Sequence, residues 1–132
     1  MSDDQHADLY WRKAIESLAG AESELANERF NNAVNRAYYA AFQAAVTKLL
    51  AGGVRTRNGR WAHTYVQSEF IGKLINRRHR FPSRLRGTLS SLQVLRHDAH
   101  YRGATIKRPE ANRAVRQSRE FVEVLERVRE SQ

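Results

Sequence analysis

Hydrophobic residues recur every three or four positions along most of this chain, with polar residues between them. This is the spacing of an amphipathic α-helix, whose apolar side chains share one face. The first such stripe predicts a helix over residues 4–26. Ser2, Asp3 or Asp4 can cap its start, where acidic residues also favour the helix dipole. Its apolar positions are Ala7, Trp11, Ala14, Leu18, Ala21 and Leu25.

A second helix is predicted over residues 29–51, with a broader apolar face that is rich in alanine. Small side chains on this face allow neighbouring helices to approach closely. Asn35 and Arg36 give its first turns a polar side, and Tyr38 and Tyr39 follow directly. Tyrosines at such positions belong to the core in most helices, although their hydroxyls can also reach a cleft. The Gly52–Gly53 pair predicts the end of the helix.

Three further helical segments follow. A basic loop over 53–61 leads into a helix over 62–77, with His63 at its start as a cap or packing residue. Pro82 suits the first position of a fourth helix, which carries residues 85–101 and ends near Gly103. Pro109 begins a fifth. No stretch alternates apolar and polar residues with period two, the pattern of a β-strand. We therefore predict an all-α fold: an up-and-down bundle of four to five helices.

The chain has 132 residues and no cysteine. Its length predicts one domain over 1–132, and the missing cysteines exclude disulfides and thiolate zinc sites. No apolar run approaches the length of a membrane span, and no signal-peptide pattern is present. We therefore expect a cytoplasmic protein that does not interact with membranes.

The positive charge is concentrated in the middle of the chain. The net charge of +9 divides into −2 over residues 1–54, +11 over 55–108 and 0 over 109–132. A concentrated basic face is expected for a polyanion partner such as RNA, but a solvated face that aids solubility has the same composition. The residues predicted to bind nucleic acid are Asn35, Arg36, Arg55, Arg57, Arg60, Arg77, Arg78 and Arg80.

Arg96 and His100 are four residues apart in the fourth helix, so their side chains lie one turn from each other. A permanent cation beside an imidazole suits phosphodiester chemistry, because the imidazole can move a proton while the guanidinium stabilises phosphate charge. The alternative is that Arg96 pairs with a carboxylate and His100 packs at the helix end. His97 and Asp98 can orient the pair. The His97-x-x-His100 spacing would suit zinc, but no third ligand is evident, so we expect no metal and no cofactor.

Several stretches resemble the HEPN domain family. They are Tyr10-Trp11-Arg12-Lys13-Ala14, the run Asn35-Arg36-Ala37-Tyr38-Tyr39-Ala40-Ala41-Phe42, His63 before Phe70, and Leu95-Arg96-His97-Asp98-Ala99-His100-Tyr101. The resemblance implies a helical bundle that commonly forms a homodimer with its polar motif facing a shared cleft. Many members are metal-independent ribonucleases, often toxins encoded beside a nucleotidyltransferase antitoxin. In those members an arginine and a histidine with four to six residues between them are catalytic.

Carried over to this chain, the resemblance implies catalytic Arg96 and His100, with support from His97, Asp98 and Tyr101. Here three residues separate the arginine from the histidine, and His100 stands where many relatives have an acid. Three hypotheses therefore remain open. The chain is an RNA-cleaving toxin or defence protein, a non-catalytic module that binds RNA or nucleotide or docks onto a nucleotidyltransferase, or a helical interaction protein with a solvated basic face.

Overall fold

The fold is a bundle of α-helices, with no strand in the part of the chain that the structure describes. A computed structural model describes residues 2–101 and 105–130, without the side chains of 101, 129 and 130. The predicted end of the fourth helix at Gly103 lies outside the described residues. The elements are α1 (Asp3–Ala26), α2 (Phe30–Ala51), α3 (His63–Glu69), η1 (Phe70–Arg77), η2 (Ser83–Leu85), α4 (Thr88–Tyr101) and α5 (Arg108–Glu130).

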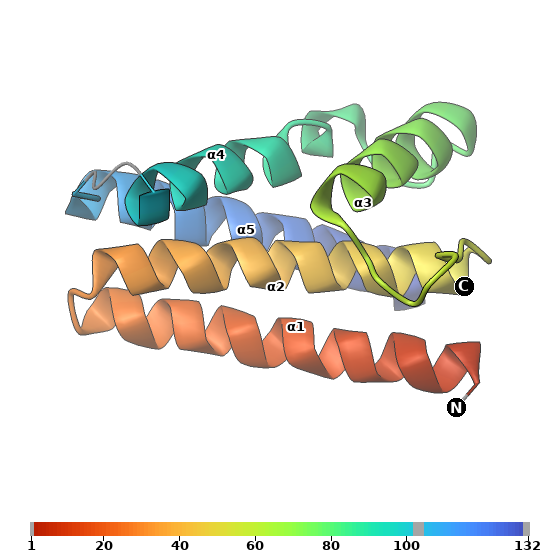
Figure 1. Ribbon diagram of the computed structural model, residues 1–132, viewed down its shortest axis with the longest axis horizontal. Coiled ribbons are helices and arrows are strands. Elements are labelled where there is room, and N and C mark those ends of the chain that lie inside the picture. Colours follow the sequence, from red (N-terminus) through yellow and green to blue (C-terminus); the bar gives the residue numbers. More distant parts are fainter. Residues whose placement is uncertain (1, 102–104, 131–132) are drawn as a thin grey trace.

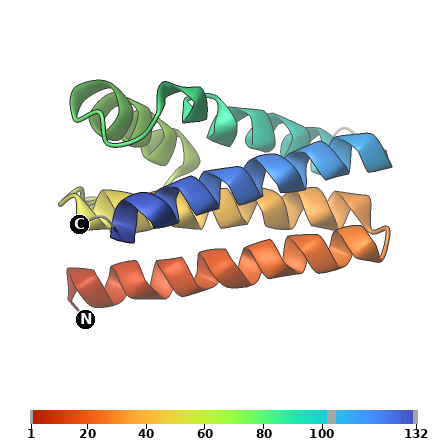
Figure 2. The ribbon, with the colours of Figure 1, turned by 180° about the vertical axis from the view of Figure 1, so that it is seen from behind.

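The four long helices run alternately up and down, as predicted (Figure 1). α2 lies at the centre and contacts α1, α4 and α5. Seen from behind, α5 crosses the molecule beside α2 (Figure 2). The short α3 covers the C-terminal half of α2, next to the start of α4 (Figure 1). The all-α prediction is therefore confirmed.

The long helices begin and end where local chemistry favours it. The Ser2 side chain accepts a hydrogen bond from the Gln5 backbone, and the Gln5 side chain accepts one from the Ser2 backbone, which makes a capping box at the start of α1. α2 ends at Gly52, followed by Gly53 with a φ of 85°, a conformation that glycine adopts without steric cost. These signals are local, so the sequence predicts them well.

Residues 62–77 depart from the prediction of one helix. α3 is an ordinary α-helix, but η1 is a π-helix, and the Arg78 backbone donates to the Lys73 carbonyl, five residues back. The wider turns bring Phe70, Leu74 and Ile75 into the core together. Phe70 packs against Phe81, at a ring-centroid distance of 5.5 Å. Aromatic packing thus accompanies a helix type that the periodicity does not predict.

The prediction that Pro82 occupies the first position of the fourth helix is wrong. Pro82 is extended, with a ψ of 147°, and precedes the single 3₁₀ turn η2. α4 begins only at Thr88. Leu85, expected in the helical stripe, is still buried because η2 turns it inward.

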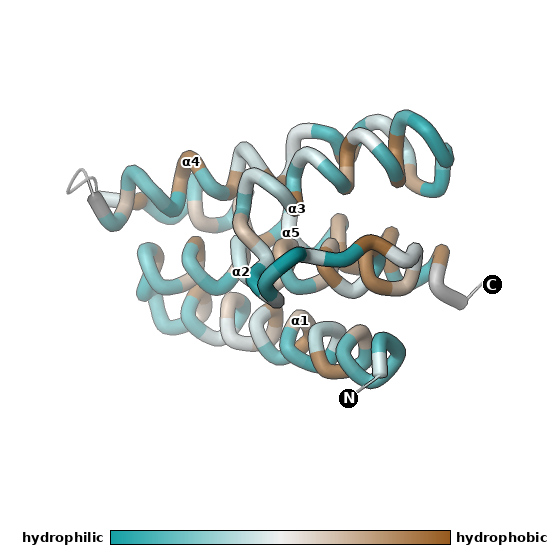
Figure 3. Tube along the Cα trace, turned by 45° about the vertical axis from the view of Figure 1, so that its right-hand side comes forward, coloured by the Kyte–Doolittle hydropathy of each residue, from teal (hydrophilic) through white to brown (hydrophobic). Residues whose placement is uncertain are grey.

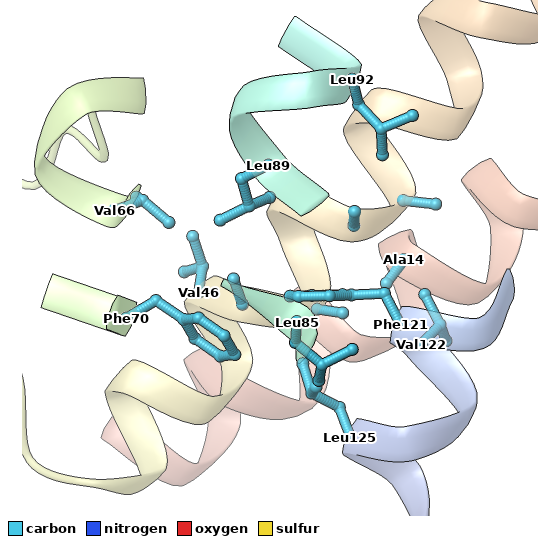
Figure 4. Packing of buried hydrophobic residues seen from close by; sticks show 14 of the residues in the cluster. Ala14, Val46, Val66, Phe70, Leu85, Leu89, Leu92, Phe121, Val122 and Leu125 are labelled. Carbon is cyan, nitrogen blue, oxygen red and sulfur yellow. The ribbon is translucent and has the colours of Figure 1, made fainter. Parts of the chain in front are cut away.

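The core lies between α2 and the other helices. Figure 4 shows Val46 of α2 among side chains of α3, η1, η2, α4 and α5. Ser118 of α5 is fully buried, and its hydroxyl donates to the Ala37 carbonyl at 2.7 Å, which fixes α5 against α2. The fully buried large side chains are Phe70, Phe121, Leu49, Leu74, Leu92, Leu125, Val34, Val46, Val66, Val115 and Val122.

Candidate functional site

Arg96 lies between α4 and α2 and is half-buried. Its Nε donates to Asn35 Oδ1 at 3.0 Å, its Nη1 to Gln93 Oε1 at 3.1 Å, and its Nη2 to the Tyr39 hydroxyl at 3.1 Å. All three acceptors are uncharged, so these bonds orient the guanidinium without neutralising it. They use three of its five N–H groups.

The guanidinium also lies against two aromatic rings. Its central carbon is 5.0 Å from the Tyr38 ring centroid and 5.1 Å from that of Tyr39. A cation over an aromatic face is stabilised by the ring's quadrupole. Asn35, Tyr38 and Tyr39 all belong to α2, at the i, i+3 and i+4 spacing that places side chains on one helix face. One face of the N-terminal half of α2 thus holds the Arg96 guanidinium in place.

His63 reaches this group from α3. Its Nδ1 lies 2.8 Å from the Tyr38 hydroxyl, and the two ring centroids are 5.6 Å apart. Burial raises the pKa of Tyr38 to about 12, against an opposing effect of Arg96. Since the phenol is neutral at ordinary pH, it can donate to Nδ1 of a neutral imidazole.

The imidazole of His63 is held in its neutral form. Burial lowers the pKa of His63 below 6.5, and the positive charge of Arg96 lowers it further, while a hydrogen bond with the Gln67 side chain acts in the opposite direction. With Nδ1 accepting from Tyr38, the ring proton belongs on Nε2. In this form both ring nitrogens of His63 are engaged, so the imidazole positions Tyr38 beside Arg96.

We call this group the Arg96 cluster; its members are Asn35, Tyr38, Tyr39, His63, Gln93 and Arg96. It joins three elements that are far apart in sequence, α2, α3 and α4. Its net character is cationic and hydrogen-bonding. A guanidinium that lies against the rings of Tyr38 and Tyr39 is the kind of group that binds phosphate in proteins.

The other predicted catalytic and supporting residues lie outside this cluster. His100 is exposed in the last turn of α4, one turn from Arg96, and His97 is exposed as well. Asp98 is half-buried and lines a cavity between α4 and α5 with Glu110 and Arg113, whereas Arg96 contacts α2. The side chain of Tyr101 lies outside the described residues.

The predicted nucleic-acid residues separate into several places. Asn35 belongs to the Arg96 cluster, whereas Arg36 lies against Gly20 of α1. Arg55, Arg57 and Arg60 are exposed in the loop between α2 and α3, where Arg55 forms an ion pair with Asp3. The remaining three follow η1 or end it. Arg77 is exposed, Arg78 Nη1 donates to the Gly52 carbonyl at 3.0 Å, and Arg80 is half-buried near the start of α1.

The sequence prediction missed His63, Gln93 and the two tyrosines as partners of Arg96. Their spacing holds a partial signal, because Asn35 and Tyr39 form an i, i+4 pair on α2, and Gln93 precedes Arg96 by three residues on α4. The contact of His63 with Tyr38 spans 25 residues and depends on the path of the loop between them. No local pattern reports that path.

Two structural properties bear on cofactors and membranes. Within the described ranges, no three histidine, aspartate or glutamate side chains gather as a metal site. Nor does any described helix combine the length and the apolar character that crossing a membrane requires.

Comparison with known proteins places the chain in a family. No curated protein matches it. The family model described as HEPN domain matches residues 7–128, which includes all of α2, α3 and α4 and so every member of the Arg96 cluster. With a match over nearly its whole length, this chain belongs to the HEPN domain family.

Proposed function

We propose that this chain is a metal-independent endoribonuclease that acts as the toxin of a toxin–antitoxin or defence system. The observation that carries the proposal is the charged guanidinium of Arg96, which uncharged side chains orient at a half-buried position between two helices. A fixed cation in such a place can stabilise the negative charge that builds up on a phosphate in the transition state.

The proton transfer is assigned to His100. It is exposed, and it lies one helical turn from Arg96. An imidazole at this position can take the proton from the ribose 2′-hydroxyl. The 2′-oxygen then attacks phosphorus, the bond to the 5′-oxygen breaks, and this leaving oxygen takes up a proton. The products are a 2′,3′-cyclic phosphate and a 5′-hydroxyl.

A homodimer would complete this mechanism. One His100 accepts the first proton, and the His100 of a second subunit, related by a two-fold axis, supplies the proton for the leaving oxygen. We expect the protein to run as a dimer in light scattering, and a monomer that still cleaves RNA would rule out the two-subunit mechanism. A nucleotidyltransferase antitoxin is the expected protein partner.

The decisive experiment compares RNA cleavage by the wild type, Arg96→Ala and His100→Ala, all purified in the same way. Loss of a positioned general acid or base costs about 10²- to 10⁴-fold, so both variants should be nearly inactive. His79→Asn is a matched control, because it removes another exposed imidazole from a left-handed position that asparagine tolerates. Equal activity in all four proteins would eliminate the catalytic assignment.

A second function is a non-catalytic module that binds RNA. It is favoured by the commitment of Arg96 to three protein acceptors, a set of bonds that a purely structural arginine would also make. In that case the wild type binds RNA in a salt-dependent way and cleaves none. RNA binding and cleavage by the same preparation therefore distinguish the two functions.

A further inference from the structure

The loop between α2 and α3 has a defined shape, although it lies at the surface. The Tyr65 hydroxyl donates to the Arg55 carbonyl at 2.6 Å, and the Arg60 backbone donates to Asn58 Oδ1 at 3.1 Å. Gly59, with a φ of 74°, makes the turn between them possible, and Val54 is buried. A loop that is held in this way can present side chains without first paying the entropy of ordering.

Three arginines project from this loop. Residues 55–58, Arg60 and Tyr65 line a hollow of about 500 Å³. Arg55 forms an ion pair with Asp3, whereas the side chains of Arg57 and Arg60 are exposed. The Asn58 amide and the Thr56 hydroxyl, which line the same hollow, can also bind phosphate. The hydrophilic part of the loop is seen at the front of the molecule in Figure 3.

Two aromatic side chains adjoin these cations. Trp61 follows Arg60 directly, and its ring centroid is 6.1 Å from that of Tyr65. Both residues are half-buried, so each rests on the core and keeps part of its ring accessible. Single-stranded nucleic acids are bound by this combination, in which cations follow the backbone and aromatic faces stack on the bases.

The loop also leads to the Arg96 cluster. Trp61 is two residues from His63, a reach of at most about 7 Å of extended chain, and His63 contacts Tyr38. Figure 1 shows the loop returning along α2 from its C-terminal end to the start of α3. An RNA strand whose phosphate is bound at Arg96 can therefore extend onto the loop between α2 and α3.

We propose that the arginine loop, residues 55–61 together with Tyr65, is a binding site for single-stranded RNA. Arg57 and Arg60 contact successive phosphates, and an unpaired base stacks on Trp61. The site deepens the proposed function and rests on it for the choice of RNA. It defines the substrate class as unpaired RNA, because bases within a duplex cannot reach an aromatic side chain.

The first test measures binding of a fluorescein-labelled oligouridylate by anisotropy, in a His100→Ala background so that the RNA stays intact. In Arg57→Gln/Arg60→Gln, the slope of log affinity against log salt should fall by about 1.4, since each phosphate contact on a single strand contributes about 0.7. Arg84→Gln/Arg119→Gln is the matched control. It removes the same charge from exposed arginines that pair with Glu120 and Glu22. Equal slopes in the two double variants would overturn the proposal.

The second test detects stacking. The chain has two tryptophans, so Trp11→Phe leaves Trp61 as the only one. Oligouridylate should quench its fluorescence, whereas inorganic polyphosphate and duplex RNA at equal occupancy should not. Equal quenching by polyphosphate would refute base stacking. Because neither test measures cleavage, a protein that binds at the loop but is inactive would refute the ribonuclease assignment alone.

Discussion

The hydrogen bond between Tyr38 and His63 can be removed by deleting one oxygen atom, in Tyr38→Phe. Only 3% of Tyr38 is exposed, so water cannot replace the lost hydroxyl. At pH 8 we expect the free energy of unfolding to fall by about 1–2 kcal/mol, because His63 Nδ1 loses its partner.

The same variant should behave differently at alkaline pH. Burial raises the pKa of Tyr38 from 10.0 to about 12. The folded protein therefore keeps a proton that the unfolded chain has lost, and this contribution to stability, complete below pH 10, is lost as the pH rises through 12. For these two pKa values the loss at pH 11 is about 1.4 kcal/mol. Phenylalanine has no such proton, so the stability difference between wild type and variant should shrink by that amount.

Urea denaturation followed by circular dichroism, between pH 8 and pH 11 at constant ionic strength, measures this difference. Ser118→Ala is the matched control. It also deletes a buried hydroxyl that donates a hydrogen bond, at a cost of about 1–2 kcal/mol, but serine does not titrate in this range. Its difference from wild type should stay constant. A difference for Tyr38→Phe that also stays constant would show that Tyr38 ionises like a solvated tyrosine, and the geometry of the Arg96 cluster would be wrong.

Three further predictions concern the cluster and the core. Because the pKa of His63 is lowered in the folded protein, the unfolded chain binds a proton more readily as the pH falls below about 6.5, and the wild type loses stability. In urea denaturation, His63→Gln should lose less stability than the wild type between pH 7 and pH 5. Asn35→Ala removes the acceptor of Arg96 Nε and should lower RNA cleavage about fivefold, with little change in thermal stability. Phe121→Ala should cost about 3–5 kcal/mol in urea denaturation, because the ring is fully buried, 5.3 Å from that of Phe70.

The bundle could be predicted from the sequence because its signals are local. The stripe of α1, the alanine face of α2 and the glycines after it each fall within a few neighbouring residues. The predictions failed at η1 and at Pro82. There the backbone adapts to Phe70, Phe81 and Leu85, whose burial depends on helices distant in sequence.

The candidate site could be predicted only in part, for the same reason. Arg96 is predicted from its spacing to His100 within one helix, which the sequence reports directly. Its partners come from α2 and α3, and whether His63 reaches Tyr38 depends on how the loop over residues 52–62 crosses α2. A histidine at the start of a short helix has many possible neighbours. Only the fold selects the one that it contacts.

The electrostatics of the cluster connect RNA binding to pH. Burial is the main cause of the lowered pKa of His63 and the charge of Arg96 adds to it, so a phosphate that binds at Arg96 and offsets this charge should raise that pKa part of the way. Binding then takes up a proton, and by linkage the affinity for RNA should increase as the pH falls from 7 to 6. The measurement compares His100→Ala with His63→Gln/His100→Ala, using oligouridylate at constant salt, so that the RNA stays intact and the two proteins differ only at His63. The double variant should show a weaker pH dependence. The same dependence in both proteins would mean that the RNA phosphates bind too far from Arg96 to offset its charge, and that the cluster is a structural support and not the substrate site.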